Sequence, residues 1–232
     1  MSYLWQEFNI KTFPAETLVF RDGVFCPELS EYSCAEYEPE KNLISIQKTS
    51  NLPVHIIYIG EIAGNINLNI DINAENSRVF MDLKTFNNLP AFLNIFIKNA
   101  GKNSFFDGKI INKNNNIFKS RQIGQHCKEN TGIFIKNKIA AFNGSNTQLS
   151  ASAIIEKNCE NCDSDISFSV MADDNATIEM KPMQYINSVP KGASHSASIY
   201  KPTQNQIKYL KMSGLSDIEL NKLLENAFLE QD

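Results

Sequence analysis

The heptapeptide Ile66-Asn67-Leu68-Asn69-Ile70-Asp71-Ile72 alternates apolar and polar residues without a break. Strict alternation over this length indicates a β-strand with one buried face, because successive side chains of a strand point to opposite sides. On both sides of this stretch the chain repeats short runs rich in β-branched and aromatic residues, separated by polar segments with Asn, Gly, Asp and Ser. We therefore expect an all-β body.

The apolar runs extend from about Leu43 to about Tyr185. They are Leu43–Gln47, Val54–Ile59, Ile66–Ile72, Arg78–Leu83, Phe92–Lys98, Lys109–Ile111, Gly132–Lys136, Thr147–Ile155, Ile166–Met171 and Ala176–Met180. No amphipathic helical period intervenes, which excludes a doubly wound βαβ sheet. Two architectures remain open, an antiparallel sandwich or barrel and a solenoid of stacked coils. Connections too long for two-residue hairpin turns favour the solenoid.

The character of the sequence changes at Pro202, so we expect a body of residues 1–200 and a helical tail of residues 201–232. Thr203-Gln204-Asn205-Gln206 has the pattern of a capping box, in which the Thr hydroxyl accepts from the backbone of the Gln and the Gln reaches back. A helix is predicted from Gln204 to about Met212, ended by Gly214 in the left-handed conformation.

A second helix is predicted after Ser216-Asp217-Ile218-Glu219, which repeats the capping box. Its apolar residues fall on one face at helical spacing, namely Leu220, Leu223, Leu224, Ala227 and Phe228. Such a stripe most often packs on its own domain. Because a short tail after an all-β body has little else to cover it, we expect part of the stripe, together with Leu215, to contact a partner.

Composition excludes some functions. Charged residues make up 21% of the 232 residues and the net charge is −4. Lysines are scattered rather than clustered, so the chain lacks the electrostatic footprint of nucleic-acid binding. Residues 1–13 lack the regions of a signal peptide, and no apolar run is long enough to cross a membrane. We expect a cytoplasmic protein with neither nucleic acid nor membrane as partner.

The five cysteines are odd in number and irregular in spacing, which suits reduced thiols better than a disulfide framework. Cys159 and Cys162 form a CxxC pair, but a structural zinc site needs four ligands and no second pair stands at suitable spacing. A structural role for these thiols is the interpretation we favour, and transient metal, cluster or sulfur handling is the alternative. Cys127 follows His126 and is a further soft ligand candidate.

Familiar catalytic motifs are missing from the sequence. It contains neither a GxxxxGK[ST] phosphate loop, nor GxGxxG after a strand, nor HExxH, nor GxSxG. We expect no active site in this chain, and any ATP hydrolysis in its process must belong to another subunit. His195 differs from the other histidines because small residues surround it in Gly192-Ala193-Ser194-His195-Ser196-Ala197-Ser198. This composition permits close approach by another backbone or subunit.

The residues from Lys181 onward resemble the SufB/SufD family, the β-helical partners of the SufC ATPase in iron–sulfur cluster assembly. The family pattern is a Pro before an apolar segment, a Val, a His among small residues, a Tyr-Leu-x-x-x-Gly-Leu stretch and a final helix. The matching residues here are Lys181-Pro182-Met183, Val189, Ala193–Ala197, Gln206–Leu210, Gly214-Leu215 and Ala227-Phe228. Thr17–Phe25, followed by Pro27–Ser30, looks like the strand that opens the SufD core.

The resemblance implies a right-handed parallel β-helix with a short helical tail. It implies pairing of the last coils with a second SufB- or SufD-like subunit, as a homodimer or a heterodimer, and docking of the tail on SufC. The tail residues offered for partner binding are Tyr209, Leu210, Leu215, Leu220, Leu224 and Phe228. The resemblance also places His195 near the subunit interface, where a transient iron–sulfur cluster would be built or passed on. His195, Cys159, Cys162 and Cys127 are the ligand candidates.

The chain departs from the family pattern at several positions. Ser196 stands where SufB-like members have Glu, which makes a SufD-like role more natural than a SufB role. Ala193 replaces a frequent cysteine, and Ser213 replaces the usual arginine before the tail glycine. The resemblance does not include the amino-terminal helical region of longer members, so we expect a compact, SufD-like member.

Two other functions stay open on the residues alone. A carbohydrate-active β-helix enzyme would use acidic residues grouped on one face, and Asp71, Asp82 and Asp107 are the candidates. The other is a β-solenoid interaction protein without metal chemistry. Co-purification of an ATPase would distinguish the iron–sulfur assembly role from it.

Overall fold

A computed structural model describes residues 16–50, 52–142 and 144–230. The prediction about residues 1–13 lies outside this part. The strands are β1 (Thr17–Arg21), β2 (Val24–Phe25), β3 (Ala35–Glu38), β4 (Leu43–Ile46), β5 (Val54–Glu61), β6 (Gly64–Ile72), β7 (Arg78–Asn87), β8 (Ala91–Asn99), β9 (Phe105–Asn114), β10 (Ile117–His126), β11 (Gly132–Ala141), β12 (Asn146–Ile155), β13 (Asp163–Ala172), β14 (Thr177–Ile186) and β15 (Gly192–Tyr200). The helices are η2 (Pro27–Leu29), η3 (Pro39–Lys41), α1 (Gln204–Met212) and α2 (Asp217–Glu230).

The strands form a parallel β-solenoid of about six turns, as predicted. Sheet A has the order β15-β13-β11-β9-β7-β5-β1-β2, and sheet B has the order β14-β12-β10-β8-β6-β4-β3. From β4 onward each strand pairs in parallel with the strand two positions further along the chain. This pairing excludes the antiparallel sandwich, in which neighbouring strands would be joined by hairpins.

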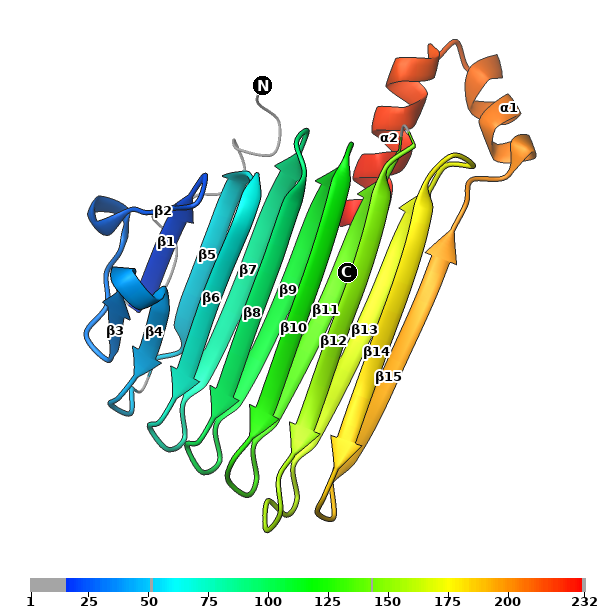
Figure 1. The fold of residues 1–232 in the computed structure, drawn as a ribbon. Coiled ribbons are helices and arrows are strands. Elements are labelled where there is room, and N and C mark those ends of the chain that lie inside the picture. The colour runs from blue at the N-terminus through cyan, green and yellow to red at the C-terminus, as the bar shows by residue number, and fades with distance from the viewer. Residues whose placement is uncertain (1–15, 51, 143, 231–232) are drawn as a thin grey trace.

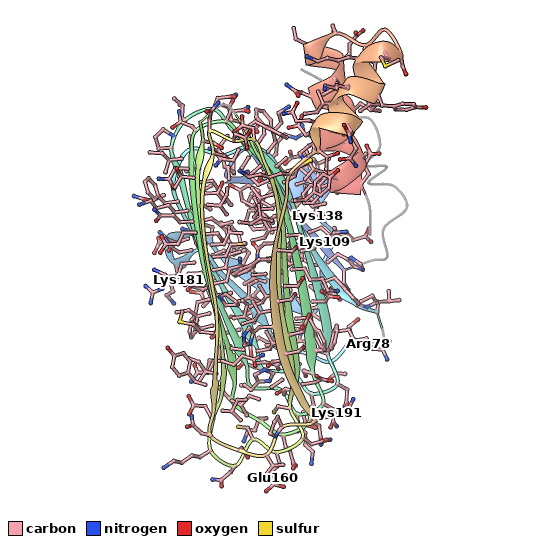
Figure 2. The ribbon with its side chains drawn as sticks, turned by 90° about the vertical axis from the view of Figure 1, so that its right-hand side faces the viewer. Arg78, Lys109, Lys138, Glu160, Lys181 and Lys191 are labelled. Atoms are coloured by element: carbon pink, nitrogen blue, oxygen red, sulfur yellow. The ribbon has the colours of Figure 1, made fainter. Side chains whose placement is uncertain are left out.

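The two sheets face each other and the chain alternates between them (Figure 1). Viewed along the solenoid axis, sheet B with Lys181 lies on one side and sheet A with Lys109 and Lys138 lies on the other (Figure 2). The two views together show that the coils advance in a right-handed sense, the usual hand for parallel crossovers. The tail helices lie at one end of the strands, on the side of sheet A.

Alternating side chains fill the space between the sheets. Ile135 pairs with Ile166 on the next coil, and both are buried. Side chains that touch across neighbouring coils are 27 to 33 residues apart in sequence. Each coil therefore contributes two strands, which explains why the apolar runs recur at half this interval. The interior also holds polar rows, such as the buried amides of Asn87 and Asn114 at 3.0 Å.

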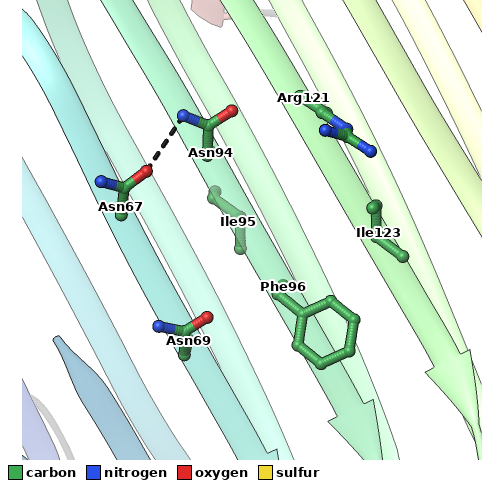
Figure 3. Close-up of a pocket in the computed structure, with 7 residues that line it drawn as sticks. All are labelled: Asn67, Asn69, Asn94, Ile95, Phe96, Arg121 and Ile123. Carbon is green, nitrogen blue, oxygen red and sulfur yellow. Dashed lines mark hydrogen bonds between the residues drawn. The ribbon is translucent and has the colours of Figure 1, made fainter. Parts of the chain in front are cut away.

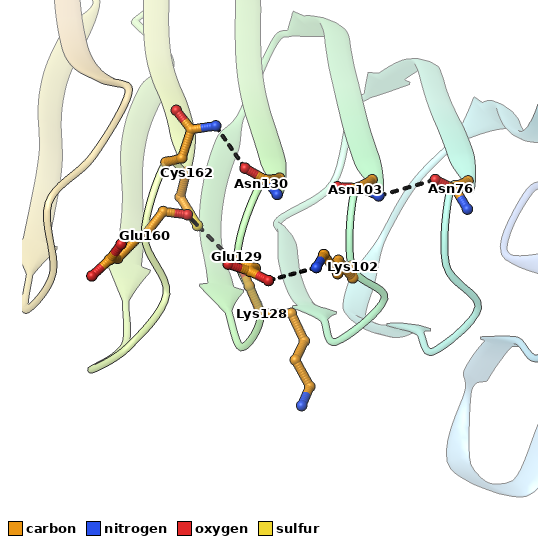
Figure 4. Close-up of polar contacts among 9 residues, drawn as sticks. Asn76, Lys102, Asn103, Lys128, Glu129, Asn130, Glu160 and Cys162 are labelled. Atoms are coloured by element: carbon orange, nitrogen blue, oxygen red, sulfur yellow. Dashed lines mark hydrogen bonds and ion pairs between the residues drawn. The ribbon is translucent and has the colours of Figure 1, made fainter.

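Asparagine ladders connect the coils on the outside. On sheet B, Asn94 Nδ2 donates to Asn67 Oδ1 at 3.0 Å (Figure 3). At the turns, Asn103 Nδ2 donates to Asn76 Oδ1 at 3.2 Å and Asn161 Nδ2 donates to Asn130 Oδ1 at 2.6 Å (Figure 4). These four turn residues have positive φ, between 56° and 58°, a conformation that Asn tolerates better than other side chains.

Among the strands that follow β4, two are missing from the sequence prediction. β10 was not expected because its inward positions include Ser120, Gln122 and His126, so the run has no apolar alternation. β15 consists mostly of small residues and lies at the end of the sheet, where burial no longer selects an apolar pattern. In both cases pairing with the preceding coil, rather than local composition, fixes the strand.

The two ends of the solenoid differ. At the amino-terminal end β1 pairs with β2, and β3 with β4, in antiparallel fashion. Aromatic rings pack beneath these hairpins, with Phe20 and Phe25 centroids 5.3 Å apart and Phe25 and Tyr37 centroids 4.7 Å apart. This end is capped, as terminal coils of solenoids generally are.

The tail has the predicted helices. Thr203 and Gln206 form the capping box, and α1 runs from Gln204 to Met212. Gly214 has φ +87°, the predicted left-handed conformation. Ser216 and Glu219 form the second capping box, with Glu219 Oε2 accepting from Ser216 N at 2.9 Å. Within the described residues no helix is long and apolar enough to cross a membrane.

Candidate functional site

The carboxy-terminal end of the solenoid is open. β14 and β15 are the last strands of sheets B and A, and among the described residues no further strand pairs with either. Their outer edges therefore present unpaired backbone groups over a full strand length, a template for another chain. Large apolar side chains are exposed here as well, including Ile186 (45%), Val189 (74%) and Ile199 (50%).

His195 lies on this open end. It pairs with Ile166 of β13, whose side chain points into the core. Because cross-strand partners share a face, the His195 side chain lies on the core side of β15. No later coil covers it, and it is exposed. Gln184 of β14 bridges the two sheets beside it, since its Nε2 donates to the Ser194 carbonyl at 2.7 Å and to Ser164 Oγ at 3.2 Å.

The cysteine candidates lie at the turns of the coils, Cys127 after β10 and Cys159 and Cys162 between β12 and β13. Cys162 is drawn in Figure 4, and Glu160 of the same turn lies at the end of the strands away from the tail helices (Figure 2). Cys159 and Cys162 are buried, and Ile155 packs against them. Cys162 Sγ lies 3.2 Å from Thr131 Oγ1 and 3.3 Å from the Lys128 carbonyl. Burial raises the pKa of the Cys159 and Cys127 thiols, so both stay protonated at neutral pH.

His126 belongs to the same network. Thr131 Oγ1 lies 3.0 Å from the Lys128 carbonyl, to which it donates. His126 Nδ1 hydrogen-bonds with the same hydroxyl oxygen at 2.8 Å. Burial lowers the pKa of His126 to about 4, and its ring is neutral at neutral pH. The buried side chains of His126, Thr131 and Cys162 thus hydrogen-bond to one another.

The structure does not bring His195 together with the cysteines of the same chain. The Cys162 carbonyl accepts from Lys191 N at 2.7 Å, which places Cys162 four strand positions before His195. At strand geometry this is a separation of about 13 Å. Within the described residues no group of three or more His, Cys, Asp or Glu side chains is arranged to hold a metal ion.

One face of the tail packs on the body. α2 covers the outer side of sheet A, where Ile111, Ala140 and Leu229 form a buried apolar cluster. Lys113 Nζ of β9 pairs with Glu225 Oε2 at 2.5 Å, and only 6% of the Glu225 side chain is exposed. The ring centroids of Phe228 and Tyr200 are 6.4 Å apart. The ammonium of Lys138 lies 5.3 Å from the centroid of the Phe228 ring.

The other face of the tail is exposed. Tyr209 (72%), Met212 (87%), Ile218 (82%) and Leu223 (47%) are large apolar side chains in contact with solvent. They come from the end of α1 and the beginning of α2, on both sides of the turn at Gly214. Large apolar side chains that are exposed together on a two-helix unit are typical of a protein interface.

The residues proposed for partner binding fall into two groups. Tyr209 is exposed, and Leu210, Leu215, Leu224 and Phe228 are half-buried. Leu220 is 3% exposed and so is already covered within this chain. Sequence reasoning missed Met212 and Ile218, because helical spacing alone selected a stripe in which Leu220 is covered by the chain itself and Leu223 is exposed. The signal was their position next to Gly214, where a large apolar residue has little to pack against.

The carboxylates considered for glycan cleavage do not share one face. Asp71 is on β6 of sheet B, while Asp82 and Asp107 are on β7 and β9 of sheet A. Asp107 pairs with Lys136 at 3.4 Å. Burial raises the pKa of Asp82.

Comparison with known proteins gave one family. A family model described as "SUF system FeS cluster assembly, SufBD core domain" matches residues 67–228. The match runs from β6 into α2 and so includes the open end and the tail. Residues 17–30, whose resemblance was noted above, lie outside it. No curated protein matches the chain significantly.

Proposed function

The chain belongs to the SufB/SufD family, and from this premise we propose that it is a non-catalytic, SufD-like scaffold subunit of a cytoplasmic iron–sulfur cluster assembly complex. It docks a second SufB- or SufD-like subunit through the open end and a SufC-like ATPase through the tail. The observation that carries this proposal is the difference between the two ends, because β2 and β3 cap one, while at the other no strand of the described residues pairs with the outer edges of β14 and β15.

The open end favours a β-solenoid partner. Two exposed strand edges and a partly apolar core cross-section are satisfied best by a partner that adds strands in both sheets. His195 would then lie in a closed interface between two cores. Since one chain supplies no set of three ligands within its described residues, a nascent cluster at His195 would take its remaining ligands from the second subunit.

The tail favours a separate docking event. Each helix begins with its own capping box. The start of α1 is therefore stabilised locally and does not depend on contacts with the body. Met212 and Ile218 project beyond the body, and a partner that covers them could pull on α2 and, through Glu225 and Phe228, on sheet A. This is a mechanical path from an ATPase to the solenoid.

Affinity purification of the full chain from its own cells under anaerobic conditions tests the proposal. We expect a P-loop ATPase and a SufB/SufD-like subunit in the eluate. Ile218→Asp should lose the ATPase and keep the solenoid partner, and Ile199→Asp should do the reverse. Val24→Asp, an equally exposed apolar site at the capped end (67%), is the matched control and should keep both. Loss of both partners with Val24→Asp, or of neither with the other two variants, would contradict the assignment.

His195 is tested separately. His195→Ala should leave both partners bound and reduce maturation of iron–sulfur clients in cells. Ser196→Ala, on the opposite face of the same strand, should be close to wild type. Normal client maturation with His195→Ala would remove His195 from the mechanism.

A further inference from the structure

Sheet B carries a shallow hollow of about 200 Å³ on its outer face (Figure 3). It lies over β6, β8 and β10. Its lining residues are Asn67, Asn69, Asn94, Ile95, Phe96, Arg121 and Ile123. Strand register sorts the outward-facing ones into two rows parallel to the solenoid axis. Asn67, Asn94 and Arg121 form the first row, and Asn69, Phe96 and Ile123 form the second.

The asparagines of the first row offer one donor and one acceptor. Asn94 Nδ2 donates to Asn67 Oδ1 at 3.0 Å, so the amide group of Asn67 and the carbonyl oxygen of Asn94 remain available to a ligand. Both side chains are exposed. A peptide unit needs this complement, a donor for its carbonyl and an acceptor for its N–H.

Arg121 at the end of this row is an available anion site. Its side chain is exposed, and none of the ion pairs among the described residues involves it. The outer face of sheet B is basic around it. Lys98 and Lys119 point outward there, against Asp71, whereas Lys181 and Glu179 pair with each other. Charge complementarity therefore favours a carboxylate, which a guanidinium binds in bidentate fashion.

The second row supplies an apolar wall. Phe96 and Ile123 are half-buried side chains of neighbouring coils, and each retains exposed apolar surface toward the hollow. Lys119 stands over the ring of Phe92, 5.8 Å from its centroid, and so belongs to a separate contact. The hollow thus has a polar, cationic side and an apolar side.

Its dimensions select an extended ligand. Side chains two residues apart on a strand are separated by about 7 Å, which sets the width between the rows. Coils are about 4.8 Å apart, so Asn67 and Arg121 are about 10 Å apart along the axis, the length of three extended residues. A helix about 10 Å across is too wide to enter.

We propose that this trough binds an extended acidic segment of a partner protein. A Glu or Asp carboxylate of the segment pairs with Arg121, its backbone hydrogen-bonds to Asn67 and Asn94, and a neighbouring apolar side chain packs on Phe96 and Ile123. Solenoid proteins use their long faces for such ligands. The site lies on the outer face of sheet B, whereas the docking surfaces proposed above are the open end and the tail.

Selection of phage-displayed random peptides of about twelve residues on the full chain tests the proposal. We expect enriched peptides to combine Asp or Glu with apolar residues. Synthetic versions should bind Arg121→Gln at least about tenfold more weakly than wild type, the loss of one charge-assisted bidentate contact. They should bind Arg78→Gln normally, since Arg78 carries the same group outward on sheet A. Replacing the acidic residue of the peptide by Gln should cause a similar loss.

Three outcomes would overturn the proposal. Selected peptides could lack acidic residues, or they could bind Arg121→Gln as well as wild type. A selection that enriches nothing over an unrelated protein would also reject it. Because Arg121 is exposed, the variant is expected to fold, and its far-ultraviolet circular dichroism and melting temperature would verify this.

Discussion

At the scale of single residues, asparagine determines the turns of this solenoid. Among the described residues, six of the seven non-glycine positions with positive φ are asparagines, and the seventh is Asp22. The asparagines of the polar segments were therefore a usable signal for turns. The sequence could not show that these amides also stack from coil to coil, because stacking depends on the coil length, which no visible repeat reveals.

Asn130 allows a direct test of this role. It has φ 56° and accepts from Asn161 at 2.6 Å. Asn130→Val should lower the free energy of unfolding by about 2 kcal/mol, because a β-branched residue is strained in the left-handed region and the ladder contact is lost. Asn130→Gly keeps the backbone conformation and should cost less than about 1 kcal/mol. Equal losses in urea unfolding would show that backbone strain is not the cause.

His126 predicts a pH dependence of stability. Burial lowers its pKa to about 4 in the folded chain, from an ordinary value of 6.5. As pH falls, the unfolded chain therefore binds the proton first. The stabilisation is complete above about pH 6.5 and is lost progressively toward pH 4, by about 3 kcal/mol in total.

The comparison that isolates this group is His126→Gln against His195→Gln. Free energies of unfolding measured between pH 7 and pH 4 should fall less steeply in His126→Gln than in wild type. His195→Gln, at an exposed site, should follow the wild-type slope. An unchanged slope in His126→Gln would mean that other groups dominate the acid response.

At the scale of elements, α2 is attached to the body by an apolar cluster and by one partly buried ion pair. Lys113→Met should leave the buried Glu225 carboxylate without its partner and loosen α2 by about 1–3 kcal/mol. The measurement is faster amide exchange in residues 217–230, with β12 unchanged. Lys136→Met, which removes a more exposed pair to Asp107, should change little. Unaltered exchange in α2 would assign its docking to the apolar cluster alone.

Elements with strong local signals were predictable from the sequence. α1 has the predicted bounds because the capping box and Gly214 fix both ends locally. β10 and β15 were not predictable, because their inward residues are polar or small and only pairing with the previous coil makes them strands. The side of α2 that faces the body depends on Ile111 and Ala140, which are far away in sequence.

The inequality of the two solenoid ends appears only at the scale of the whole molecule. The residues that resemble the family predicted partner binding by the last coils and the tail. The placement of His195 on the core side of the last strand agrees with this prediction. The separation of His195 from Cys162 could not be read from the sequence, because it depends on how the turn before β15 is registered against β13. The account therefore assigns partner binding to the open end and the tail, and not to the capped end.

Hydrogen–deuterium exchange on the complex purified from its own cells, compared with the isolated chain, tests this assignment most directly. We predict strong protection on assembly in two places, the edges of β14 and β15 and the region of residues 209–223, with unchanged exchange in β2 and β3. Protection of β2 and β3 instead, or no change in residues 177–200, would contradict the account.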